Sequence, residues 1–138
     1  VHRLLRLRRH LQALFNPETP HGDDQKARTQ EPGHLTRHWH GVRLGQPDWA
    51  SWSHTLAWSL DDPQHGALVW CGMNAYHKPM TFEVPRPAQG WLRCIDTALA
   101  GQEALPGDPQ PWQGVERELE GRSLVLLVQP PLLKGARL

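Results

Sequence analysis

Carboxylates are the side chains of this sequence best suited by type to hydrolytic chemistry. Hydrolysis of a glycosidic bond, for example, needs two of them held a fixed distance apart. The candidates lie in turn-like stretches or at the end of an apolar run: Asp48, Asp61, Asp62 and Asp96. Aspartates in such places commonly cap a turn through a side-chain oxygen. The sequence therefore predicts turn-capping roles for these carboxylates and offers no catalytic residue.

Histidine and cysteine could instead bind a metal ion. His38 and His40 stand two residues apart, which places both imidazoles on one face of a strand. No third ligand is recognisable near them, and Cys71 and Cys94 lack the C-x-x-C spacing of a metal or redox site. Each cysteine lies in an apolar run, where a free thiol behaves as a small hydrophobic side chain. We predict no metal ion and no cofactor, and a disulfide between the two cysteines stays open.

Tryptophan occurs seven times, and the flat faces of indole rings can stack on sugar rings. Within apolar, strand-like runs, aromatic bulk usually fills the core. That role is predicted for Trp58, Trp70 and Trp91. Side chains in loops are exposed more often and carry function more often. The candidates for contact with a sugar are therefore the loop residues Trp49, Trp52 and Trp112, and Trp39 stays open between the two roles.

Residues 1–15 are predicted to form a helix. Their apolar side chains fall at helical spacing and make one stripe: Leu4, Leu7, Leu11, Leu14 and Phe15. Asn16-Pro17 ends the helix, because the residue before a proline is pushed out of the α region. No capping residue precedes the pattern, and the sequence starts with Val. We therefore expect a helix cut from a longer chain, with a stripe that packs on a neighbouring element missing from this sequence.

Beyond this helix the sequence divides into a linker, a β-rich domain and a tail. Residues 16–34 are polar, contain three prolines and are predicted to be a linker or a surface loop. Residues 35–128 are predicted to be an antiparallel β-sandwich, because apolar runs alternate with turn signals every ~8–14 residues. The predicted strands are Thr36–Leu44, His54–Leu60, Ala67–Met73, Met80–Val84, Trp91–Ile95, Val115–Leu119 and Ser123–Val128. Residues 129–138 form the tail.

Two of these strands carry a burial pattern. Leu56, Trp58 and Leu60 alternate with two small residues, as expected of a strand with one buried face. Ser123–Val128 is apolar after its first residue and is predicted to be a central strand covered on both faces.

Charge and hydropathy exclude several classes of partner. The net charge of +1 gives no long-range field that would select nucleic acid or an anionic membrane. The N-terminal helix is basic, but its cationic face ends at Phe15. No stretch approaches the ~18 apolar residues that span a bilayer. Two cysteines without a disulfide framework suit a reducing compartment, and we predict a cytoplasmic location.

Four motifs in order resemble one protein family. His40–Trp49 and Ser53–Ala57 resemble the pattern W-H-G-V…P-D-W…S-x-x-L-A that opens the C-terminal domain of isoamylase-type debranching enzymes. The other three segments resemble that family's N-A-x-x-x-P-L-x-F-x-L-P, W-x-x-x-I-D-T-A and R-S-V-V-V-L patterns: Asn74–Pro85, Trp91–Ala98 and Gly121–Val128. The basic helix Leu4–Phe15 is similar to the last helix of the family's catalytic barrel.

The resemblance implies both a fold and a role. The family belongs to glycoside hydrolase family 13 of the α-amylase clan, whose debranching members hydrolyse α-1,6 linkages in glycogen or amylopectin. It implies a retaining mechanism with an Asp nucleophile and a Glu acid on a (β/α)8 barrel, and none of those barrel motifs occurs here. It therefore implies a non-catalytic sandwich that supports the barrel of the same polypeptide, with branched α-glucan as the partner of the parent enzyme.

Two other interpretations stay open. One is a free-standing glucan-binding module that uses Trp49, Trp52 and Trp112. The other is a small independent hydrolase that uses Asp48 or Asp61.

Overall fold

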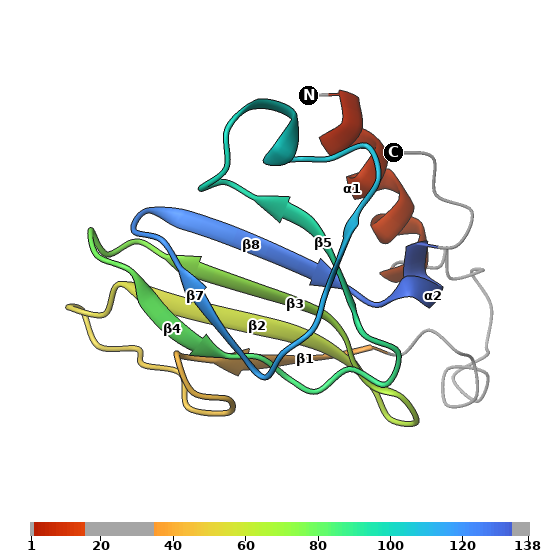
Figure 1. Ribbon diagram of the computed structural model, residues 1–138. Helices are drawn as coiled ribbons and strands as arrows, with labels where there is room; N and C mark the ends of the chain where they lie inside the picture. The colour runs from red at the N-terminus through yellow and green to blue at the C-terminus, as the bar shows by residue number, and fades with distance from the viewer. Residues whose placement is uncertain (1, 16–34, 134–138) are drawn as a thin grey trace.

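The chain folds into two antiparallel sheets and one N-terminal helix (Figure 1). The computed structural model describes residues 2–15 and 35–133, and for residues 11–15 it describes the backbone alone. The predicted antiparallel β-sandwich with a short N-terminal helix is confirmed. The predicted linker, residues 16–34, lies outside the described residues.

The larger sheet has six strands in the order β1-β2-β3-β8-β5-β6, and the smaller sheet pairs β4 with β7. The elements are α1 (His2–Phe15), β1 (Thr36–His40), β2 (Thr55–Asp62), β3 (Gly66–Asn74), β4 (Met80–Glu83), β5 (Trp91–Asp96), the 3₁₀ helix η2 (Gly101–Glu103), β6 (Gln110–Trp112), β7 (Glu116–Leu119), β8 (Ser123–Val128) and α2 (Pro130–Leu133). None of the helices in the described ranges is long and apolar enough to cross a membrane.

The space between the two sheets is filled by one apolar cluster, which we call the inner core. Its members are Ala57, Ala67, Trp70, Phe82, Val84, Trp91, Leu119, Val125 and Leu127. Trp70 of the large sheet meets Phe82 of the small sheet edge to face, with ring centroids 6.2 Å apart. The indole N–H of Trp91 donates to the carbonyl of Pro85 over 3.0 Å. The predicted core positions of Trp70 and Trp91 are confirmed.

The opposite face of the large sheet carries a second cluster, which we call the outer cluster: Leu7, Val69, Cys71, Cys94, Leu126 and Val128. Leu7 belongs to α1 and is only 2% exposed, so the helix lies against this face (Figure 1). Leu132 and Leu133 of α2 pack against the same cluster. The middle of the large sheet is therefore covered on both sides, and β8 is the doubly covered strand that its apolar run predicts.

Strand β2 has its two faces arranged differently from the prediction. The fully buried residues are the small ones, Ala57 and Ser59, which face the small sheet. Trp58 and Leu60 lie half-buried at the margin of the outer cluster. The alternation separates the two faces of a strand, but burial depends on which face a second layer covers. The prediction that Trp58 is a core residue is therefore only partly met, because Trp58 packs against the outer cluster but stays half-buried.

Strand β1 ends at His40, four residues earlier than predicted. The amides of Gly41 and Gln46 both donate to the carbonyl of Arg43, so the chain turns away from the sheet. A Cβ atom on Gly41 would lie 2.5 Å from the carbonyl oxygen of Gln46, and this close approach requires glycine.

The sequence did not predict β6 or α2. Pro111 interrupts the pattern of β6, yet β6 is an edge strand, where a missing N–H is tolerated. Helix α2 occupies the start of the predicted tail and begins with Pro130, a residue suited to the first helical position. Between β8 and α2, the buried side chain of Gln129 bonds the backbone of Ala67 and Gln89, which anchors the start of this tail.

Asn74 joins the connections that carry the chain between the two sheets. Its side chain is 1% exposed, and its amide nitrogen lies 2.9–3.1 Å from the carbonyls of Lys78, Leu119 and Glu120. Its amide oxygen accepts the N–H of Tyr76. One residue of the N-A-x-x-x-P pattern therefore holds the β3–β4 and β7–β8 connections together.

Candidate functional site

Three of the four aspartates cap turns as the sequence predicts, whereas the prediction is wrong for Asp61, which lies in β2 and accepts a hydrogen bond from Ser59. Oδ1 of Asp48 accepts the N–H of Ala50 at 3.0 Å. Oδ1 of Asp62 accepts the N–H of Gln64 at 2.7 Å, and this backbone hydrogen bond is the main reason why the pKa of Asp62 is lowered. These turn-capping predictions are confirmed.

Asp96 combines a turn cap with an ion-pair network between the two sheets. Its Oδ1 accepts the N–H of Ala98, and its Oδ2 lies 3.0 Å from Nη2 of Arg117 on β7. Nη1 of Arg93 lies 3.7 Å from the same oxygen. The three side chains are only 10–16% exposed, so solvent screens these pairs weakly. Asp96 therefore joins β5 to β7, and its carboxylate is committed to structure.

Asp61 ends a hydrogen-bonded chain that contains the side chains of a serine-hydrolase triad. Ser59 Oγ lies 2.8 Å from Nε2 of His40 and 2.7 Å from Oδ1 of Asp61. The N–H of Gly45 donates to Nδ1 of His40 over 2.7 Å. Since Nδ1 accepts, the neutral imidazole carries its proton on Nε2 and donates it to Ser59. Ser59 in turn donates to Asp61.

This order of donors excludes nucleophilic catalysis by Ser59. A serine nucleophile needs a base that can accept its proton, and both nitrogens of His40 are already engaged. Burial lowers the pKa of His40, partly opposed by the negative charge of Asp61. The chain His40–Ser59–Asp61 therefore holds the turn at residues 41–45 on the edge of the sheet.

The engagement of His40 also argues against a metal site at His38 and His40. His38 has a half-exposed side chain whose Nε2 lies 3.9 Å from Asp61. Within residues 2–15 and 35–133 no three His, Cys, Asp or Glu side chains are grouped so that they could hold a metal ion.

The two cysteines lie in the outer cluster as free thiols. Burial raises the pKa of Cys71 and of Cys94 to about 12 each. Both thiols are therefore protonated near neutral pH, where a reactive cysteine would need its thiolate form.

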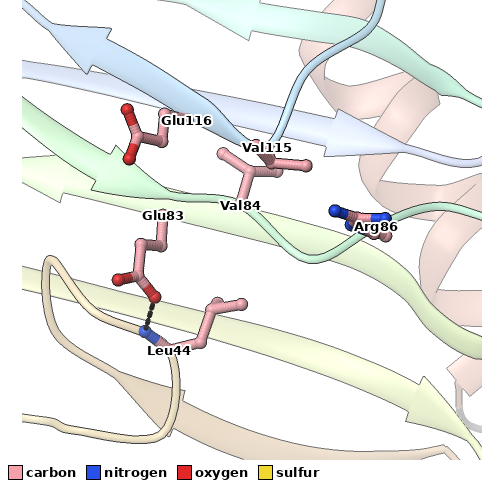
Figure 2. A pocket seen from close by; sticks show the side chains of 6 residues that line it. All are labelled: Leu44, Glu83, Val84, Arg86, Val115 and Glu116. Carbon is pink, nitrogen blue, oxygen red and sulfur yellow. Dashed lines mark hydrogen bonds between the residues drawn. The ribbon is translucent and has the colours of Figure 1, made fainter.

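An open surface pocket of about 250 Å³ lies between β4, β7 and the turn after β1 (Figure 2). It is lined by Leu44, Glu83, Val84, Arg86, Val115 and Glu116. Figure 2 shows the carboxylate of Glu83 directed to the backbone N–H of Leu44, which it accepts over 3.1 Å. Glu83 is thereby used to attach the turn to β4. The pocket contains two carboxylates, those of Glu83 and Glu116, which lie opposite each other in the β4–β7 pair, but that of Glu83 is bonded to the backbone N–H of Leu44.

The tryptophans are the predicted site residues that the structure leaves available. Trp49 is 64% exposed and Trp52 is 76% exposed, both in the loop between β1 and β2. Trp112 lies in strand β6 rather than in a loop, is half-buried, and packs against the inner core. The guanidinium of Arg117 covers its ring at 5.3 Å from the centroid. The three predicted tryptophans therefore do not form one site, because Trp49 and Trp52 are exposed in a loop whereas Trp112 is half-buried in β6.

Trp39 is the exposed aromatic residue whose role the sequence left open. It lies on β1, is 40% exposed, and meets Trp49 edge to face with ring centroids 5.5 Å apart. The guanidinium carbon of Arg37 lies 5.8 Å from the centre of the Trp39 ring. The signal for this grouping is the Arg-x-Trp alternation, which places Arg37 and Trp39 on one face of β1.

The predicted apolar stripe of α1 is buried at one leucine and exposed at another. Leu7 is buried in the outer cluster, so it packs against the chain's own sheet. Leu4 is 48% exposed and Leu5 is 42% exposed. Arg3 donates to the carbonyl of Leu105, and His10 bonds the carbonyl of Leu132. For Leu11, Leu14 and Phe15 only the backbone is described.

A family model described as "Isoamylase 1-3, C-terminal" matches residues 38–111, more than half of the chain. The chain belongs to the isoamylase C-terminal domain family. Isoamylase 1, chloroplastic, of Oryza sativa subsp. japonica is 32% identical over 87 residues, which cover 62% of this chain and 10% of that protein. This isoamylase C-terminal domain therefore spans about a tenth of the length of that relative.

The motifs of this isoamylase C-terminal domain serve mostly structural ends. His40 and Gly41 shape the turn after β1, Asn74 joins two connections, and Asp96 pairs with Arg117. Trp39 and Trp49, which begin and end the pattern W-H-G-V…P-D-W, stay exposed instead.

Proposed function

We propose that this chain is the non-catalytic C-terminal domain of a debranching enzyme that hydrolyses α-1,6-glucosidic linkages in glycogen or a related glucan. The observation that carries the proposal is the match to the C-terminal part of isoamylases over residues 38–111. The use of Asp96 and Asp62 in ion pairs and turns supports a domain that contributes no acid or nucleophile.

We infer that the domain stabilises a catalytic barrel of the same polypeptide. In this proposal residues 1–15 are the last helix of the barrel, 16–34 a linker, 35–128 the sandwich and 129–138 a tail. Leu7 attaches the helix to the sandwich, and the exposed Leu4 and Leu5 would face the rest of the barrel. Each ~100 Å² of apolar surface covered in this way contributes about 2.5 kcal/mol of gross transfer free energy.

The partners in this proposal are the barrel and, through the parent enzyme, a branched α-glucan. The buried free thiols of Cys71 and Cys94 suit a reducing compartment, for which we propose the cytoplasm.

The gene sequence upstream of the codon for Val1, read in frame, tests the proposal directly. We expect several hundred codons that encode a barrel with the family's Asp nucleophile and Glu acid. A start signal immediately before Val1 would contradict the proposal. Release of reducing sugar from glycogen by the 138-residue chain alone would instead support the small independent hydrolase.

A second function, binding of glucan by the domain itself, is favoured by the exposure of Trp49, whose side chain is 64% exposed. It predicts that the chain is retarded in a native gel that contains glycogen, and that Trp49→Ala removes the retardation. Mobility unchanged by glycogen would exclude this function.

A further inference from the structure

Trp39 and Trp49 form one exposed aromatic surface at the edge of the large sheet, which we call the tryptophan pair. Their ring centroids are 5.5 Å apart and their planes are inclined by 75°. They remain 40% and 64% exposed, whereas Trp70 and Trp91 are at most 1% exposed. The pair is therefore not needed to fill either apolar cluster.

The residues around the pair are fixed by contacts within the domain. Trp39 lies directly opposite Trp58 in the β1–β2 register, so the half-buried Trp58 supports it on the same face. Trp49 follows Asp48, whose carboxylate caps the turn that continues to Ala50. The turn that leads to this loop is held by the hydrogen bond from Gly45 to His40. The two rings are thus held in place before any ligand arrives, which reduces the entropic cost of binding.

Polar groups border the pair on the side of the sheet edge. The guanidinium carbon of Arg37 lies 5.8 Å from the centre of the Trp39 ring, so its hydrogen-bond donors stand beside the pair. Within the described sheet β1 pairs only with β2, so its other edge presents unpaired backbone N–H and C=O groups (Figure 1). An apolar ring face with donors and acceptors at its border matches a pyranose ring, which has an apolar C–H face and a perimeter of hydroxyl groups.

We propose that the tryptophan pair is a stacking site for glucose units of an α-glucan chain, with Arg37 bonding sugar hydroxyls. The inference rests on the proposed function for the identity of the sugar, but it does not need the catalytic barrel. It replaces the predicted set Trp49, Trp52 and Trp112 by Trp39 and Trp49, because these two lie together.

The test is a titration of the whole 138-residue chain with maltoheptaose. Binding is measured by the change in tryptophan fluorescence and, separately, by calorimetry. We expect saturable binding, with a dissociation constant raised roughly tenfold by Trp39→Ala or Trp49→Ala, as for the loss of an anchoring aromatic side chain. Trp52→Ala is the matched control, since Trp52 is also exposed but makes no aromatic contact with the pair. Its affinity should equal that of the unchanged chain.

Circular dichroism and the urea midpoint of each variant show whether it is folded, and Trp39→Phe keeps an aromatic ring if Trp39→Ala is unfolded. Absence of saturable binding of maltoheptaose would overturn the inference, as would unchanged affinity in folded variants of both tryptophans. Self-association that Trp49→Ala abolishes would assign the pair to a protein interface and also overturn it. A barrel found upstream of Val1 without glucan binding would leave the proposed function standing while this inference fails.

Discussion

The two faces of the large sheet differ in how completely the chain covers them. On the inner face, Trp70, Leu127 and Trp91 are at most 1% exposed beneath the small sheet. On the outer face, α1 covers the middle through Leu7, while Trp58 and Leu60 stay half-buried and Trp39 is exposed. Neighbouring residues of one strand, such as Leu126 and Leu127 of β8, belong to different clusters.

This difference separates the buried residues that stabilise the fold from the exposed aromatic residues at the surface. The small sheet covers the inner face from within the chain, so the side chains of the inner core are fully buried. The outer face is closed only where α1 and α2 reach it, and its margin carries the exposed aromatic residues. Substitutions at the margin of the outer face should therefore cost less of the free energy of unfolding than substitutions in the inner core.

The largest effect is expected for Trp70→Ala on the inner face. Truncation of a fully buried aromatic side chain leaves a cavity and costs about 3–5 kcal/mol of the free energy of unfolding. Urea denaturation followed by circular dichroism measures this loss. Trp58→Ala on the neighbouring strand is the control and should cost clearly less, because Trp58 is only half-buried. Equal losses for the two variants would remove the distinction between the faces.

A second comparison lies within α1. Leu7→Ala should destabilise the domain by about 2–5 kcal/mol, because Leu7 is buried among the side chains of the outer cluster. Leu4→Ala should change the free energy of unfolding by less than about 0.5 kcal/mol, because Leu4 is 48% exposed. Urea midpoints of the two variants test the pair. A large loss for Leu4→Ala would mean that its surface is already covered within the chain.

Sequence patterns predicted the parts of the fold that depend on neighbours along the chain. The apolar run of β8 and the turn at Asp62 needed only local information, and both are confirmed. The predicted burial of β2 is wrong, because the small sheet, which comes later in the chain, covers the face that carries Ala57 and not the face that carries Trp58. The packing of Leu7 against this sheet was likewise not predictable, since its neighbours Val69 and Leu126 are far away in sequence.

The candidate site was predictable only in part. Exposure of Trp49 and Trp52 followed from the loop signals around them. The contact between Trp39 and Trp49 could not be predicted, because it depends on how the turn after His40 returns the chain to β1. The strand that contains Trp112 was not predictable, because Pro111 is typical of a loop and the strand forms only by pairing with β5.

Protonation of His40 should lower the free energy of unfolding by a smaller amount and so make the stability of the domain depend on pH. Burial lowers the pKa of His40 in the folded domain below its ordinary value of 6.5. The unfolded chain therefore takes up the proton first as the pH falls. The contribution of His40 to stability should be complete above about pH 6.5 and should decline as the pH falls through that value toward the folded pKa.

Urea midpoints at pH 8 and pH 5.5 (about one unit and more on either side of the unfolded pKa) measure this dependence. In His40→Asn the difference between the two midpoints should shrink. In His2→Asn, which alters an exposed side chain of α1, the difference should stay as it is. An unchanged difference in His40→Asn would show that other groups cause the pH dependence.

The smallest effect on folding is expected at the tryptophan pair. Trp49→Ala removes a side chain that is 64% exposed and loses the edge contact with Trp39, for which we expect a cost below about 1 kcal/mol. Trp52→Ala, which removes a side chain that is 76% exposed, should cost even less. Both losses are measured by urea denaturation without glucan. A loss at Trp49 as large as that at Leu7 would place the pair among the residues that fold the domain. A small loss leaves an aromatic surface that the fold does not require, and such a surface is available to bind a ligand.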